Sequence, residues 1–182
     1  MKNLRDIFRR LPLDGTVRDA LRSFNLHPAV DGKARSVKAL AEKLGFFVEQ
    51  VEMPEGTTGR LVKDAFSPNG YCIEVNRRHS VQARRWAVLH EIGHFLLHAD
   101  HNDPFAADMA FDASGFEFYL EEDLVKEREA NEFAEVLLFG DGALEAAYGF
   151  YCGNLERICH HFGVSERVLR IALRKYIRSG MR

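Results

Sequence analysis

A short run of the chain places two histidines and a glutamate at the spacing found in metal-dependent hydrolases. The run is His90-Glu91-Ile92-Gly93-His94. On a helix, His90 and His94 lie one turn apart on the same side, so that both imidazoles can bind one zinc ion. Glu91 stands beside the first histidine, where its carboxylate can take a proton from a zinc-bound water. The run therefore predicts a hydrolytic site and not only a binding site.

The residues around these histidines are typical of a buried helix. No proline interrupts residues 80 to 103. The apolar positions of the run are Trp86, Val88, Leu89, Ile92, Phe95, Leu96 and Leu97. A core helix whose histidines only hydrogen-bond internally is the alternative interpretation, and a third metal ligand would argue against it.

A third protein ligand is required if two histidines are to hold catalytic zinc. In the extended form of the motif a third histidine would follow at position 100, but that residue is Asp100, and Leu97 replaces the glycine that precedes it in the pattern. His98 would lie about 5 Å beyond the second ligand along the helix. We interpret His98 as a neighbour of the site or a packing residue, and Glu127 as the better candidate.

Glu127 belongs to a predicted helix over residues 121–138. Glu127 and Asn131 share one face of that helix, so Glu127 can bind the metal while Asn131 hydrogen-bonds the ring of a ligating histidine. Ala130 borders this face, and its small side chain would let two helices approach closely. A charged, solvent-exposed face is the alternative, but it does not explain the apolar residues that follow Ala130.

Two stretches of the chain together resemble the ImmA/IrrE family of zinc metallopeptidases. The stretches are RRWAVLHEIGHFLLH at residues 84–98 and EREANEFAEVLL at residues 127–138. The similarity extends upstream to residues 73–76 and downstream to residues 162–165, and so spans residues 37 to 176. The two motifs in this order are more specific than the first motif alone.

The resemblance implies a gluzincin-type site in which His90, His94 and Glu127 bind Zn²⁺ and Glu91 is the general base. It also implies a protein substrate, because members of this family typically cleave helix-turn-helix repressors and so relieve transcriptional repression. One departure lies at residues 138–141, where Leu-Phe-Gly-Asp stands in place of the Leu-Leu-Met-Pro common in the family. This departure concerns the chain after the helix and not the ligands.

We therefore expect a cytoplasmic zinc endopeptidase. Two other classes of function stay open. A non-catalytic regulator would bind a repressor or DNA and keep the metal helix as a scaffold, although a scaffold has no need of Glu91. A zinc hydrolase of a small substrate would share the ligands and differ only in the walls of its cleft. By residue type alone, the candidates for stabilising the oxyanion are Tyr119, Tyr148 and Tyr151.

The periodicity of the chain predicts an α+β fold that is mostly helical. Residues 46–53, 59–62 and 70–76 predict a small antiparallel three-stranded sheet directly before the metal helix. The acidic stretch at residues 100–115 is either a substrate rim or a plain connector. We expect a zincin-like metallopeptidase domain over residues 1–140 and a C-terminal helical hairpin, packed on it, over residues 141–182.

The C-terminal hairpin resembles a helix-turn-helix. Residues 155–162 and 166–177 predict two helices joined by a tight turn, with Ser165 as the cap of the second helix. The basic residues of that helix are Arg167, Arg170, Arg174, Lys175 and Arg178. The helix could contact DNA, or its basic face could lie in water. We favour the second interpretation, because neither a dimerisation element nor a set of base-reading Asn and Gln residues is evident.

Composition sets the broad class. The chain has 182 residues, of which 46% are hydrophobic and 29% charged, and these values are those of a soluble globular protein. The net charge of −2 argues against a chain built wholly to coat nucleic acid. Three cysteines without paired spacing indicate neither disulfides nor a thiolate zinc cluster, which fits a reducing compartment. No stretch approaches the ~20 apolar residues that span a bilayer, so we expect no membrane association.

Overall fold

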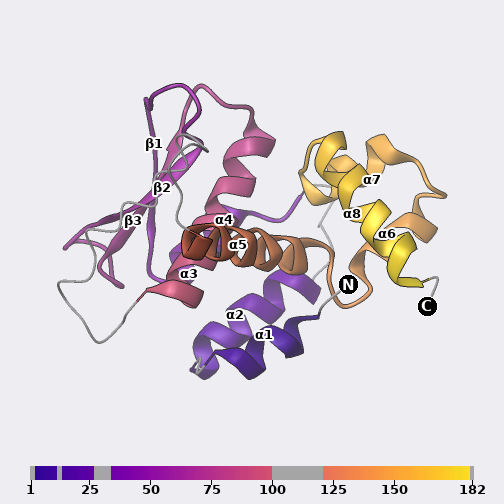
Figure 1. Ribbon diagram of the computed structural model, residues 1–182, viewed down its shortest axis with the longest axis horizontal. Coiled ribbons are helices and arrows are strands. Elements are labelled where there is room, and N and C mark those ends of the chain that lie inside the picture. The colour runs from indigo at the N-terminus through magenta and orange to yellow at the C-terminus, as the bar shows by residue number, and fades with distance from the viewer. Residues whose placement is uncertain (1–2, 12–13, 27–33, 100–120, 181–182) are drawn as a thin grey trace. The chain divides into compact units, whose positions relative to one another are not determined.

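The computed structural model describes residues 3–11, 14–26, 34–99 and 121–180 (Figure 1). These residues form a mostly helical α+β fold, as predicted. In chain order the elements are α1 (Leu4–Arg10), α2 (Gly15–Leu26), α3 (Val37–Lys43), β1 (Phe47–Val51), β2 (Gly59–Lys63), β3 (Tyr71–Asn76), α4 (Val81–His98), α5 (Glu121–Phe139), α6 (Ala143–Phe150), α7 (Leu155–Phe162) and α8 (Glu166–Gly180). The acidic stretch at residues 100–115, predicted to be either a substrate rim or a plain connector, and the candidate Tyr119 lie outside the described residues.

The chain divides into two compact units. The first unit joins residues 1–36 to residues 135–182, and the second comprises residues 37–134. The first unit is thus built from both ends of the chain, and the boundary between the units lies within α5. The domain boundary predicted at residue 140 falls inside the first unit and stays a prediction.

The second unit contains a three-stranded sheet with the order β1-β3-β2. β2 pairs with β3 in antiparallel fashion, but β1 pairs with β3 in parallel, so the predicted all-antiparallel sheet is wrong for β1. β3 takes the centre because its side chains are the most apolar of the three strands, and Ile73 and Val75 are almost fully buried. β1 and β2, which are consecutive in the chain, thus lie on either side of β3, and β1 runs in the same direction as β3.

Asn76, at the end of β3, holds the connection between β1 and β2. Its buried side-chain amide donates to the carbonyl oxygens of Thr57, at 2.9 Å, and Met53, at 3.5 Å. Its backbone N–H donates to the carbonyl oxygen of Thr58 at 3.0 Å. A buried amide is stabilised by such hydrogen bonds, and here they tie the crossing connection to the central strand.

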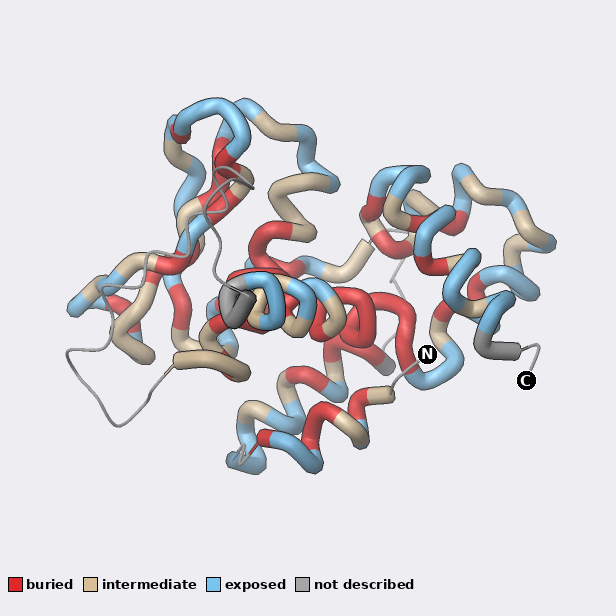
Figure 2. Tube along the Cα trace, in the orientation of Figure 1, coloured by how far each residue is buried: buried red, intermediate tan, exposed pale blue. Residues whose placement is uncertain are grey.

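α4 is buried over more than two turns, from Ala87 to His94 (Figure 2). It begins after Ser80, whose hydroxyl accepts a hydrogen bond from the backbone N–H of Ala83 at 3.2 Å. The rings of Phe46 and Phe95 meet edge to face with centroids 4.8 Å apart. A helix that is apolar on most of its faces is covered by its neighbours on several sides, and this fixes the position of the side chains that α4 carries.

α4 and α5 approach each other closely at two small residues. A Cβ atom placed on Gly93 would lie 3.1 Å from both the Cα and the carbonyl oxygen of Ala130, and 3.2 Å from the ring of Phe133. Ala130 itself has no exposed surface. The close approach predicted for Ala130 is confirmed, and Gly93 is the residue of α4 that permits it.

The first unit is held by polar contacts between segments far apart in the sequence. The side-chain amide of Asn25 donates to the carbonyl oxygens of Val136 and Leu137, the latter at 3.1 Å. At the start of α1, the carboxylate of Asp141 accepts from the backbone N–H of Leu4 at 3.1 Å. These contacts join the N-terminal helices to the end of α5.

Gly93→Ala tests the close approach of the two helices. The added methyl group meets the backbone of Ala130, which has no room to move away from buried neighbours. We expect a loss of about 1–3 kcal/mol in the free energy of unfolding, measured by urea denaturation.

Gly149→Ala on α6 is the matched control, because no atom lies within 4 Å of the position of its Cβ. Its stability should be unchanged or slightly raised by the better helix propensity of alanine. Equal losses in the two variants would contradict the role assigned to Gly93.

Candidate metal centre

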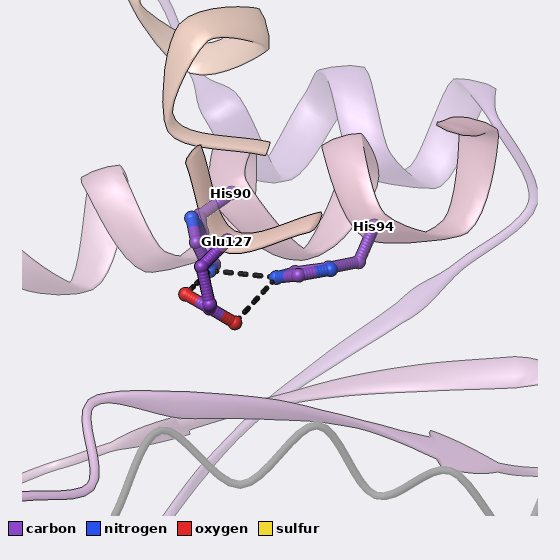
Figure 3. Close-up of side chains that lie close together, drawn as sticks. All are labelled: His90, His94 and Glu127. Atoms are coloured by element: carbon purple, nitrogen blue, oxygen red, sulfur yellow. Dashed lines mark hydrogen bonds and ion pairs between the residues drawn. The ribbon is translucent and has the colours of Figure 1, made fainter. Parts of the chain in front are cut away.

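The side chains of the three predicted metal ligands converge (Figure 3). The Nε2 atom of His94 lies 3.0 Å from one carboxylate oxygen of Glu127, and the Nε2 atom of His90 lies 3.3 Å from the other. The two Nε2 atoms are 2.9 Å apart. In the part of the chain that the structure describes, no other group of His, Cys, Asp and Glu side chains gathers in this way.

Two rigid elements supply these side chains. His90 and His94 lie one turn apart on α4, and Glu127 reaches them from α5. The His94 side chain is fully buried, His90 is 11% exposed and Glu127 is 24% exposed. The group is therefore dry on the α4 side and accessible to solvent beside the carboxylate.

The donor set fits a divalent metal ion. Two imidazole nitrogens and one carboxylate are a common ligand set of catalytic zinc, which keeps a further position for water. Two imidazole nitrogens at 2.9 Å repel each other unless a proton or a cation lies between their lone pairs. A cation at the point where His90, His94 and Glu127 meet would remove this repulsion. These residues could therefore hold a metal ion.

The pKa values of the three groups indicate how a metal would compete with protons. Burial raises the pKa of Glu127, but hydrogen bonds and charges from both histidines outweigh burial and lower it to about 2. Burial is the main cause that lowers the pKa of His94. Burial acts on His90 in the same direction, but Glu127 and Glu91 together raise its pKa. Protons therefore compete with a metal more strongly at His90 than at His94.

Glu91 is a buried carboxyl group beside this cluster. It is 2% exposed. Burial raises its pKa to about 8; the charge of His90 lowers the pKa and the charge of Glu127 raises it, but burial is the largest of the three effects. Its Oε2 atom is buried and has no hydrogen-bond partner among the residues that the structure describes. A carboxyl group with a raised pKa and an oxygen available for a proton has the properties of a general base. That role stays a prediction.

Gly59, at the start of β2, lies against the same carboxyl group. A Cβ atom there would lie 3.1 Å from both the side chain of Ala87 and the carbonyl oxygen of Glu74, and 3.6 Å from Oε1 of Glu91. β2 and α4 thus meet beside Glu91. Sequence reasoning missed this residue, because a glycine at the start of a strand gives no sign of which helix will pack on it.

Asn131 links the two helices beside the cluster. Its side-chain oxygen accepts from the indole Nε1 of Trp86 at 3.2 Å, and its amide nitrogen donates to the carbonyl oxygen of Glu127 at 2.8 Å. It also contributes to the raised pKa of His90. The sequence indicated only apolar packing for Trp86, whereas its indole N–H binds α5. The prediction that Asn131 orients a ligating ring stays a prediction.

The remaining candidates are His98 and two tyrosines, and the ring of His98 lies 5.6 Å from that of His94, centroid to centroid. His98 Nε2 is 3.2 Å from the carbonyl oxygen of Lys126 and 3.8 Å from the carboxylate of Glu129. His98 is therefore a neighbour of the site, as predicted. Tyr148 and Tyr151 belong to the first unit, where the Tyr151 hydroxyl lies 3.2 Å from Nδ1 of His161.

Comparison with protein families identifies the family of this chain. A family model described as the IrrE N-terminal-like domain, a peptidase family, matches residues 41–174. A search of curated proteins finds no match. None of the helices among the described residues is long and apolar enough to span a bilayer.

Glu127→Ala should lower the affinity for zinc by roughly 100-fold or more, because it removes one of three converging ligands. The measurement is zinc bound per chain by mass spectrometry after dialysis. Glu129→Ala is the matched control on the same helix, and it should keep the metal. An equal loss in both variants would show that Glu127 is not a ligand.

Glu91→Gln should flatten the pH dependence of stability in the metal-free protein. Between pH 4.5 and about 8 the folded chain keeps the Glu91 proton and the unfolded chain loses it, so stability falls by up to about 1.4 kcal/mol per pH unit as the pH rises. Glutamine does not titrate. In EDTA, urea denaturation should therefore favour the variant increasingly from pH 5 to pH 8. A constant difference between variant and parent would contradict the raised pKa.

Proposed function

The chain belongs to the peptidase family of IrrE N-terminal-like domains, and from this premise we propose that it is a zinc-dependent endopeptidase that cleaves a helix-turn-helix transcriptional repressor. The observation that carries the proposal is the convergence of His90, His94 and Glu127 beside the buried carboxyl group of Glu91. Ligands alone would suit a structural metal. A carboxyl group with a raised pKa beside them suits hydrolysis.

His90, His94 and Glu127 would hold the zinc ion. When bound, zinc supplies a Lewis acid that polarises a carbonyl and acidifies water. Glu91 accepts the proton of the attacking water at Oε2, and then delivers it to the nitrogen of the leaving amine. A nearby cation favours the ionised form of a carboxyl group. Burial opposes that effect, and so the pKa of Glu91 can stay close to neutrality, where the group both accepts and releases a proton.

β2 supports a peptide as the substrate. It is an edge strand of the sheet, and no other strand pairs with its outer side in the residues that the structure describes. Gly59 of β2 lies beside Glu91. An extended peptide can add to such an edge through backbone hydrogen bonds, which would bring its carbonyl groups next to the proposed base. The choice of a repressor as substrate rests on the family resemblance.

Glu91→Gln should keep zinc and lose cleavage by about two to four orders of magnitude, because a glutamine cannot take the proton of water. The measurement is the product of a candidate helix-turn-helix repressor, incubated with the zinc-loaded protein and separated by mass. Glu129→Gln should cleave at the parent rate. Full activity of the Glu91 variant would end the proposed mechanism.

The same incubation separates the peptidase from a non-catalytic regulator. The regulator would bind the repressor without producing a cut chain, and Glu91→Gln would leave that binding unchanged. A pure scaffold gains nothing from a buried Glu91 oxygen that has no hydrogen-bond partner among the described residues, and this observation favours the peptidase.

A further inference from the structure

α7 and α8 are joined by a short turn of the kind found in a helix-turn-helix. α7 ends at Gly163, which has a φ of +65°, and the backbone N–H of Val164 returns to the carbonyl oxygen of Cys159 at 3.1 Å. The hydroxyl of Ser165 accepts from the backbone N–H of Val168 at 3.4 Å, as predicted for a helix cap. A short turn through a left-handed glycine is typical of this motif.

One face of the hairpin forms its own apolar core. The residues of this core are Ile158, Phe162, Val164, Leu169 and Ala172, and each is at most 5% exposed. Residues on both helices and in the turn contribute, so the hairpin angle is fixed by packing. The opposite face of α8 consequently points to solvent.

That opposite face carries four arginines and one isoleucine at helical spacing. Arg167, Arg170, Ile171, Arg174 and Arg178 recur every three or four residues, and all are exposed. We call these five residues the basic stripe. Ile171 lies in the middle of the basic stripe and is 44% exposed.

The basic residues of α8 differ in their ion pairs. Arg170 pairs with Glu166 one turn earlier, with Nη2 and Oε1 2.5 Å apart. Among the residues that the structure describes, the other three arginines of the stripe form no ion pair. By contrast Lys175, which lies off the stripe, pairs with the buried carboxylate of Glu135 and so attaches α8 to α5. Lys175 thus binds α8 to α5, while the side chains of the basic stripe lie in solvent.

We propose that the basic stripe binds double-stranded DNA, with α8 in the major groove. The major groove is about 12 Å wide and admits an α-helix. α8 is about 22 Å long, and the four arginines are distributed over about 16 Å of that length. Several of them can therefore contact the DNA at the same time. Arg167, Arg170 and Ile171 lie toward the N-terminal end of α8, the end that reads bases in this motif. Arginine contacts guanine and an apolar side chain contacts the methyl group of thymine. Arg174 and Arg178 then contact phosphates.

The sequence favoured a solvated basic face, because neither a dimerisation element nor a set of base-reading Asn and Gln residues is evident. The structure adds the exposure and the ion pairing of the arginines, together with a short apolar core that holds the helix in a fixed position. An exposed isoleucine between arginines is compatible with a base-reading face, which employs both residue types. The proposal does not depend on the peptidase activity, because α8 carries none of the metal ligands.

The test measures binding of the full-length chain to a fluorescent duplex of about 30 base pairs with random sequence, by anisotropy at several salt concentrations. The variant Arg167→Gln/Arg174→Gln/Arg178→Gln removes three positive charges from the stripe. It should bind at least tenfold more weakly at low salt. The slope of log affinity against log salt should fall by about 0.9 for each phosphate that the variant no longer neutralises.

The matched control removes the same charge from α1 and α2 of the same unit, through Arg5→Gln/Arg9→Gln/Arg18→Gln. These arginines are also exposed, and this variant should bind DNA like the parent. Thermal unfolding of both triple variants checks that they remain folded, which is expected because exposed side chains are replaced. A single-stranded oligonucleotide of equal length should compete more weakly than the duplex.

Three results would overturn the proposal. They are absence of duplex binding by the parent protein at low salt, an equal loss in the control variant, and competition by single strands as strong as that by the duplex. The last two would mean that overall charge, and not α8 in a groove, attracts the nucleic acid.

Discussion

The backbones of α4 and α5 touch where Gly93 meets Ala130, and the metal centre depends on that contact. The ligands come from both helices, and metal sites tolerate errors of only about 0.2 Å in ligand distance. Glu127 lies three residues before Ala130, so any side chain that pushed the helices apart would also withdraw the carboxylate. The small side chains of Gly93 and Ala130 therefore allow Glu127 to reach the two histidines. The hydrogen bonds of Asn131 to Trp86 and to Glu127 add a second connection beside the contact.

Much of the fold could be predicted from the sequence because helices encode their geometry locally. Apolar spacing indicated the metal helix and the Glu127 helix, and the cap at Ser165 is a short-range pattern. The direction of β1 could not be predicted in this way. It depends on which strand takes the centre of the sheet, and that choice follows from how deeply Ile73 and Val75 are buried by distant helices. The pairing of the two chain ends in one unit is likewise a long-range outcome.

The candidate site shows the same division. His90 and His94 are related by helical periodicity within one motif, and Glu127 could be selected because its helix face also carries Ala130 and Asn131. Gly93 and Gly59 were missed, since the need for a small residue arises from a neighbour on another element. The hydrogen bond of Trp86 was missed for the same reason. Sequence pattern thus located the chemical groups, while the contacts that bring them to the right distance required the structure.

The buried carboxyl group of Glu91 has a consequence for the stability of the metal-free chain. A chain without its metal must keep Glu91 protonated, or ionised in a site that excludes water, and either condition lowers the stability of the empty chain near neutral pH. A metal that binds only the folded state reverses that loss by mass action. A bound metal would thus act as a stabilising ligand of the fold, and the stability of the protein would depend on the metal concentration.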